Sequence, residues 1–132
     1  MTKEELKLRT KNFAIDSILF VNSLPKSKAN DVMSYQLIKS ATSVGANCRS
    51  ACRGRSTAEF VSKLNIVLEE ADESCYWYEI LEKLNYEVNH EERKRLLNEA
   101  NELTAIFASA IKTLKKEQEF QKNKSEILNL KS

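Results

Sequence analysis

Apolar residues recur at helical spacing along most of the chain, and three interruptions divide this pattern into four stretches. The pattern predicts helices over about Glu4–Ser23, about Ala29–Arg53, from Ser56 to a turn at 85–89, and from near Asn89 onward. No alternating pattern typical of strands competes with them. Four helices of this length with short connections predict an all-α fold, an antiparallel up-down-up-down four-helix bundle.

Residues at the interruptions are those that end and begin helices. Pro25 disfavours helix in the residue before it, and Gly54 stands where a left-handed C-terminal residue is expected. Ser56 and Glu59 have the spacing of a capping box, and Glu92 has the same relation to Asn89. We therefore expect short, defined loops between the helices.

Two of the expected helices carry apolar residues on more than one side. In the first helix, Phe13 and Phe20 lie nearly opposite Leu8, Ile15 and Leu19. In the third, a mixed stripe with Ile66 and Trp77 accompanies the core-facing stripe. One bundle core buries one face of each helix, so the extra faces predict contact between subunits. We take Phe13, Phe20, Ile66 and Trp77 as candidate oligomer-interface residues.

The C-terminal end of the chain is polar from about Glu117. The clear period of the fourth helix stops there, although Ile127, Leu128 and Leu130 could extend an amphipathic face. This predicts a bundle domain over residues 1–118 and a polar tail over 119–132 that is a frayed helix or disordered.

Charge is divided unevenly between two neighbouring segments. From Pro25 to Ser56 there are six basic residues and one acidic residue, and from Thr57 to His90 there are two basic and eight acidic residues. Such segments complement each other within or between subunits, or they present a basic surface to an acidic partner. In the second case Lys39, Arg49, Arg53 and Arg55 are the candidate nucleic-acid-binding residues.

The residues that carry enzyme chemistry are sparse. Cys48 and Cys52 lie four residues apart among Ala, Val and Gly, where cysteine behaves as a small apolar residue, and His90 is the only histidine. The sequence contains no Gly-rich phosphate loop, nucleophile elbow or zinc pattern, and with one histidine it cannot contain the two Glu-x-x-His motifs of a di-iron bundle. We expect a protein that is not an enzyme and has no catalytic residues, metal or cofactor. A metal or redox bundle that uses the cysteines is the weaker alternative.

The first residues are polar and no apolar run approaches the length of a membrane span, which predicts a cytoplasmic protein without a membrane partner.

The run from Gln36 to Asn47, the run from Arg53 to Ile66 and the segment from Leu68 to Leu81 together resemble a known family. These are the bacterial four-helix bundle proteins named after 23S rRNA intervening sequences. The accessory variability determinant of diversity-generating retroelements is related to them. The resemblance implies a four-helix protomer assembled as a homopentameric ring, and nucleic-acid association is suggested for some members. It implies no catalytic residues.

Together these observations predict a binding or assembly module that forms a homo-oligomer and associates with RNA, DNA or a nucleic-acid enzyme. The alternative is a structural or protein-protein interaction scaffold that binds no nucleic acid.

Overall fold

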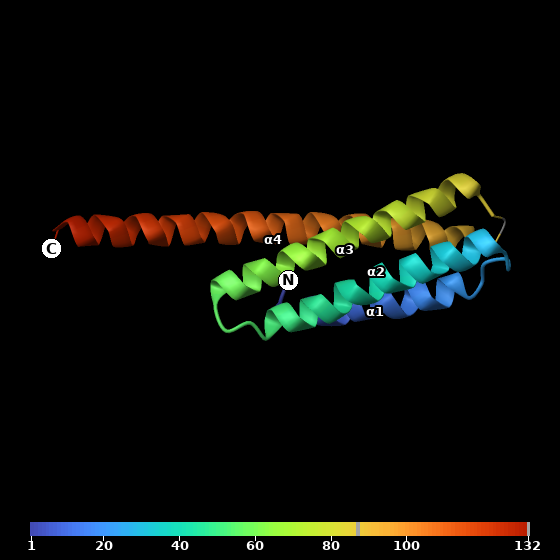
Figure 1. Ribbon diagram of the computed structural model, residues 1–132, viewed down its shortest axis with the longest axis horizontal. Helices are drawn as coiled ribbons and strands as arrows, with labels where there is room; N and C mark the ends of the chain where they lie inside the picture. Colours follow the sequence, from blue (N-terminus) through green and yellow to red (C-terminus); the bar gives the residue numbers. More distant parts are fainter. Residues whose placement is uncertain (87, 132) are drawn as a thin grey trace.

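Four helices account for nearly all of residues 1–86 and 88–131, which are the residues that the computed structural model describes. They are α1 (Lys3–Val21), α2 (Lys28–Cys52), α3 (Thr57–Leu84) and α4 (His90–Lys131). Successive helices run in opposite directions along one long axis (Figure 1). The described chain is therefore the predicted all-α four-helix bundle, with helix bounds close to those expected from the sequence.

Three helices begin at a side-chain cap. The hydroxyls of Thr2, Ser27 and Ser56 accept the backbone N–H three residues further on, at 3.0–3.1 Å. Each cap satisfies a backbone donor that has no partner within its helix. The expected cap at Ser56 is thus confirmed. The side chain of Glu92, which was expected to take part in a cap with Asn89, accepts a hydrogen bond from Arg95.

The helix C-termini differ in how they turn. Asn85 ends α3 with a φ of 51°, and its N–H donates to the Leu81 carbonyl. The expected left-handed conformation at Gly54 is wrong, because no glycine has a positive φ among the described residues. A Cβ at Gly54 would lie 3.0 Å from the Ala51 carbonyl oxygen and 3.3 Å from the Phe60 nitrogen. Gly54 is therefore required for close approach between the two helix ends.

The core lies between the inward faces of all four helices. Each helix packs on its neighbour in the chain, and α1 closes the bundle through a less extensive contact with α4. Leu37, Val67, Leu96 and Phe107 have no exposed surface. The helical spacing seen in the sequence of α2, α3 and α4 thus identifies the core-facing sides of these helices correctly.

The two apolar sides of α1 have different surroundings. Phe13 and Phe20 are each 2% exposed and pack inside the bundle, whereas Leu8, Ile15 and Leu19 are 61%, 45% and 62% exposed. The larger aromatic residues fill the core, and the aliphatic stripe is left on the outside.

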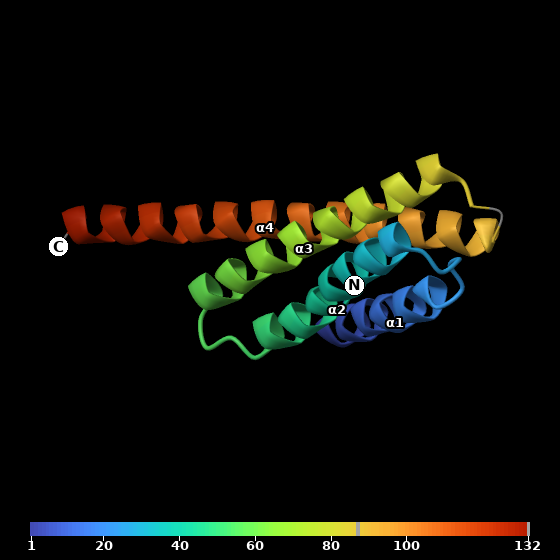
Figure 2. The same ribbon diagram turned by 45° about the vertical axis from the view of Figure 1, so that its right-hand side comes forward.

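The end of α4 projects far beyond the bundle end at which the α2–α3 loop lies (Figures 1 and 2). The helix continues to Lys131, and every side chain from Glu119 to that residue is exposed. The division into a domain over 1–118 and a tail over 119–132 stays a prediction, and Ser132 lies outside the described residues. The tail, as far as it is described, is helical.

Candidate nucleic-acid interface

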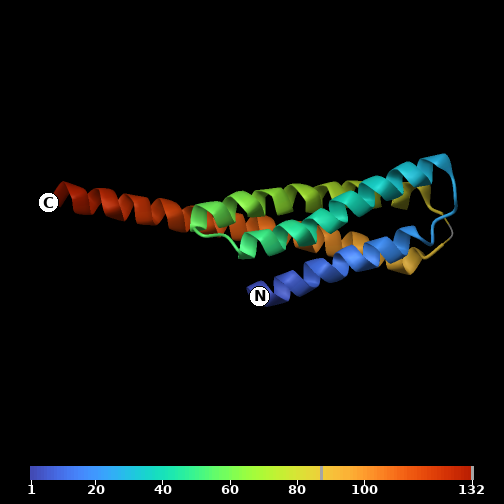
Figure 3. The same ribbon diagram turned by 60° about the horizontal axis from the view of Figure 1, so that its bottom comes forward.

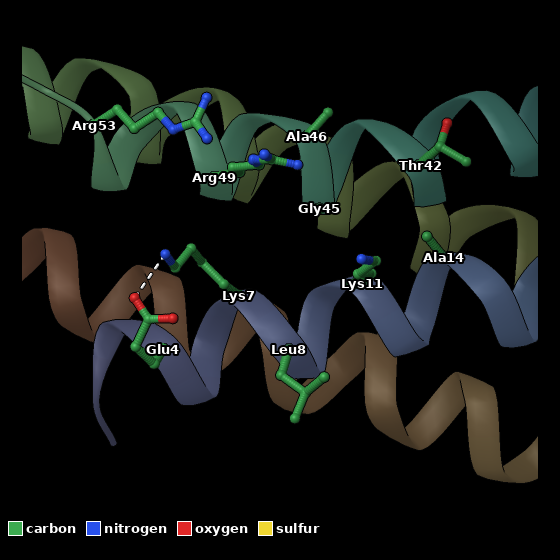
Figure 4. Close-up of a pocket in the computed structure, with 10 residues that line it drawn as sticks. All are labelled: Glu4, Lys7, Leu8, Lys11, Ala14, Thr42, Gly45, Ala46, Arg49 and Arg53. Carbon is green, nitrogen blue, oxygen red and sulfur yellow. Dashed lines mark ion pairs between the residues drawn. The ribbon is translucent and has the colours of Figure 1, made fainter.

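A groove of about 520 Å³ runs between α1 and α2 (Figure 4). Its lining residues are Glu4, Lys7, Leu8, Lys11, Ala14, Thr42, Gly45, Ala46, Arg49 and Arg53. They come from one side of each helix at spacings of three and four residues. On α1 the lining extends from Glu4 near the start of the helix to Ala14. Figure 3 shows the arrangement of α1 and α2 from another side.

Gly45 allows α1 and α2 to approach each other closely beside the groove. A Cβ at Gly45 would lie 3.3 Å from the carbonyl oxygen of Thr10 and 3.6 Å from the nitrogen of Lys11. Glycine in mid-helix costs about 1 kcal/mol relative to alanine. The close packing explains why Gly45 is tolerated here, as the sequence indicates.

Cations from both helices face the groove. Lys7 and Lys11 extend from α1, and Arg49 and Arg53 extend from α2 on the other side (Figure 4). Lys7 pairs with Glu4 one turn earlier at 2.7 Å. Within residues 1–86 and 88–131, Lys11, Arg49 and Arg53 form no ion pair. The groove therefore carries uncompensated positive charge.

The acidic side chains of α3 do not neutralise this charge. Among the described residues no ion pair joins α2 to α3. Burial and the neighbouring Glu73 raise the pKa of Glu70, and the charge of Lys39 partly opposes the shift. Lys39 of α2 thus acts on Glu70 of this acidic segment.

The four candidate nucleic-acid-binding residues separate into two groups. Arg49 and Arg53 line the groove together, whereas Lys39 and Arg55 are exposed outside its lining. Lys7 and Lys11 also line the groove and were not among the residues expected from the sequence. Their four-residue spacing puts them on one side of α1, but only the pairing of α1 with α2 brings them beside the arginines.

The candidate interface residues also separate. Phe13 and Phe20 are core residues and are not part of the outer face. On α3, Ile66 is 37% exposed, and Trp77 is half-buried with its Nε1 donating to Glu73 at 3.3 Å. The interface role of Ile66 and Trp77 stays a prediction. On α1 the outward stripe, defined by Leu8, Ile15 and Leu19, is the surface that could meet another subunit.

The cysteines face different helices. Burial raises the pKa of Cys48 to about 11, and Thr10 of α1 partly opposes the shift through a hydrogen bond. The sulfur of Cys75 lies 3.5 Å from the Thr104 hydroxyl of α4. All three cysteines, including Cys52, are free thiols. In the described part of the chain no group of three or more His, Cys, Asp or Glu side chains could hold a metal.

None of the helices in residues 1–86 and 88–131 combines the length and the apolar character that crossing a membrane requires.

The chain is a small all-α protein of the four-helix bundle class, with a basic groove between α1 and α2 and an exposed aliphatic stripe on α1. The family model described as "23S rRNA-intervening sequence protein" matches residues 4–109, and the chain belongs to this family. The match spans α1, α2, α3 and most of the part of α4 that packs in the bundle.

A solved structure from Bacteroides thetaiotaomicron is similar to the chain. It is described as a protein with unknown function from the S23 ribosomal protein family. The two share 35% identity with a TM-score of 0.74, over 85% of this chain and 99% of the relative. No curated protein matches the chain. Neither the family description nor that of the relative names an enzymatic activity.

Proposed function

We propose that this protein is a non-enzymatic cytoplasmic module that assembles into a homo-oligomeric ring, with a pentamer preferred, and binds RNA or DNA through the groove between α1 and α2. The observation that carries the proposal is that Lys11, Arg49 and Arg53 face one groove from two helices and form no ion pair with any described residue. Its support comes from charge and geometry.

The chemistry of the groove fits a phosphate backbone. A guanidinium presents several donors in a planar fork that can bind phosphate oxygens in pairs, and lysine adds a compact point charge. Arg49 lies in the last turn of α2 and Arg53 is its C-cap residue, four residues further on, so the two guanidinium groups follow each other along the groove. None of these contacts reads a base edge, and we expect binding that depends weakly on sequence.

Assembly would multiply this interaction. Leu8, Ile15 and Leu19 leave an aliphatic stripe on the outside of α1, and Leu8 also lines the groove. A ring repeats the groove around an axis, so several weak phosphate contacts act on the same nucleic acid. The stripe on α1 and the mixed stripe on α3 are the surfaces that we assign to the ring contacts.

Binding to short fluorescent RNA and DNA of mixed sequence, at about 50 and 200 mM salt, tests the proposal. The wild type should bind with an affinity that falls steeply as salt rises. Arg49→Ala/Arg53→Ala should weaken binding at low salt at least tenfold. Lys26→Ala/Lys28→Ala is the matched control, because it removes the same charge from exposed positions outside the groove and should bind like the wild type.

A scaffold without nucleic-acid binding is the second candidate. The observation in its favour is the acidic segment of α3, which forms no ion pair with α2 in the part of the chain that the structure describes. In an oligomer the α3 segment of one subunit could cover the basic groove of the next. Arg49→Ala/Arg53→Ala would then reduce the mass of the oligomer in light scattering, and the intact assembly would bind neither RNA nor DNA.

A further inference from the structure

The projecting part of α4 has an apolar side that nothing in the described chain covers. Phe120, Ile127, Leu128 and Leu130 are 65%, 53%, 58% and 87% exposed. Spacings of seven and three residues put Phe120, Ile127 and Leu130 within one side of the helix. Lys116 and Lys124 lie four residues before and after Phe120, on the same side. We call residues 116–131 the C-terminal extension.

The C-terminal extension is part of one continuous helix, and every side chain from Glu119 onward is exposed. Short isolated helices are marginal in water, and most helical stability in proteins comes from packing of an apolar face. An amphipathic helix of this kind is therefore expected to be stabilised by a surface that covers it.

A second apolar feature lies between α3 and α4, in a groove of about 640 Å³. Tyr76, Ile80, Leu84 and Leu97 provide its apolar lining, and Tyr76 and Leu84 are 55% and 47% exposed. Glu79, Glu82 and Lys83 complete the lining. We call this the α3–α4 groove.

The charges of the two features are opposite. Between Glu69 and Leu84, α3 carries six acidic residues and one lysine. Over residues 116–131 the extension carries four lysines and three glutamates, and Lys116 and Lys124 lie on its apolar side. An amphipathic helix laid in an apolar groove is a common recognition mode, with anchors at spacings of three, four and seven residues. The extension is an amphipathic helix and the α3–α4 groove has an apolar lining with acidic residues beside it, so the two features fit this recognition mode.

The two features cannot meet within one chain. Leu97 and Ile127 are both on α4, and thirty residues of helix separate them by roughly 45 Å. The groove lies near the end of the bundle at which α4 begins, and the extension projects past the opposite end (Figures 1 and 2). Contact between them therefore requires two copies of the chain.

We propose that the C-terminal extension of one copy docks in the α3–α4 groove of a second copy, with Phe120, Ile127 and Leu130 as anchors and Lys116 and Lys124 facing Glu79 and Glu82. The extension lies beyond the family match at residues 4–109, and the similar solved structure is covered almost completely by 85% of this chain. The proposed contact shares no lining residue with the groove between α1 and α2. It involves a segment of α4 that lies outside the family match.

A charge exchange in the full chain tests this proposal. Lys116→Glu/Lys124→Glu and Glu79→Lys/Glu82→Lys should each weaken self-association about tenfold or more in sedimentation velocity, and an equimolar mixture of the two variants should restore it. Lys26→Glu/Lys28→Glu is the charge-matched control and should associate like the wild type. Unchanged association of both variants, or a mixture no stronger than either variant alone, would overturn the proposal.

A photo-crosslinking amino acid in place of Phe120 gives a second, independent measurement. Isotopically light and heavy copies are mixed, so that crosslinks between copies are recognised by mass. The proposal requires light-to-heavy crosslinks to the segment from Tyr76 to Leu84 or to the region of Leu97. Crosslinks to the outer stripe of α1, crosslinks only within one copy, or no crosslinks in a folded protein would contradict it.

Discussion

The hydroxyl of Tyr78 donates a 2.7 Å hydrogen bond to the Ser17 hydroxyl and so joins α3 to α1 across the bundle core. Both side chains are fully buried. The Tyr78 ring also packs against Phe13 and Phe20, with centroid distances of 6.3 and 5.7 Å. Burial raises the pKa of Tyr78, and the hydrogen bond to Ser17 partly opposes the shift. This contact helps to hold the aromatic side of α1 inward and the aliphatic side outward.

We predict that removing the two hydroxyls of this hydrogen bond has non-additive effects on the free energy of unfolding. Tyr78→Phe and Ser17→Ala should each lower the free energy of unfolding by about 1–2 kcal/mol, because each leaves a buried hydroxyl without its partner. The double variant should lose less than the sum of the two. Chemical denaturation of the four proteins gives the coupling energy, and strictly additive losses would show that the bond contributes nothing specific.

Arg9 is predicted to stabilise the contact between α1 and α4. Its guanidinium contacts Glu99 at 2.6 and 2.8 Å and Glu102 at 2.5 Å, in a partly buried position. Arg9→Ala should lower the free energy of unfolding by about 1–2 kcal/mol. Arg95, which pairs with Asp16 and Glu92, is 53% exposed, and Arg95→Ala should cost less than about 1 kcal/mol. Equal losses in urea denaturation would contradict this ranking.

The buried thiols are predicted to react slowly. Burial raises the pKa of Cys48 from its ordinary value of 9.0 to about 11, and burial also raises the pKa of Cys75. Cys52 is only half-buried. Iodoacetamide near pH 8 should therefore modify Cys52 first, as peptide mass spectrometry can determine. Modification of Cys48 at the rate of Cys52 would be inconsistent with this environment.

The same shift makes stability depend on pH. The folded state keeps Cys48 protonated at pH values at which the unfolded state has lost the proton. The stabilisation is fully present below about pH 9 and is lost as the pH rises through about 11. Cys48→Ala should remove this part of the pH dependence in thermal unfolding measured between pH 8 and 11.

The salt dependence of nucleic-acid binding should distinguish groove residues from other cations. Lys11→Ala and Arg49→Ala should each reduce the slope of log affinity against log salt by about 1, because each removes one phosphate contact. Lys39→Ala and Arg55→Ala should leave the slope unchanged, since neither lines the groove. If Lys39→Ala and Arg55→Ala reduced the slope and Lys11→Ala and Arg49→Ala did not, the interface would lie outside the groove.

The sequence determines most of the fold through features that are local. Helical periods in α2, α3 and α4, together with residues such as Pro25 and Ser56, predict the helices and their ends. The orientation of α1 was not predictable in this way, because both its sides are apolar. Which side enters the core depends on the space left by Tyr78 and its neighbours, and that space exists only in the assembled bundle.

The candidate site was predictable in part for the same reason. The spacing of Arg49 and Arg53 shows that they share a side of one helix, and the structure brings them together. Lys7 and Lys11 join them only through the packing of α1 on α2, which is a relation between distant segments. Gly45 was the available signal, because a glycine in mid-helix marks a close neighbour without identifying it.

The contact between α1 and α4 is less extensive than the other helix contacts and relies on ion pairs of Arg9 and Arg95. Apart from the exposed C-terminal extension of α4, α1 is therefore the segment whose amides should exchange with solvent through the smallest local unfolding event. Because Lys7 and Lys11 are on α1 and the arginines are on α2, undocking of α1 would dismantle the basic groove while the other three helices stay folded. Binding of an anion across the two helices should slow amide exchange in α1 most of all.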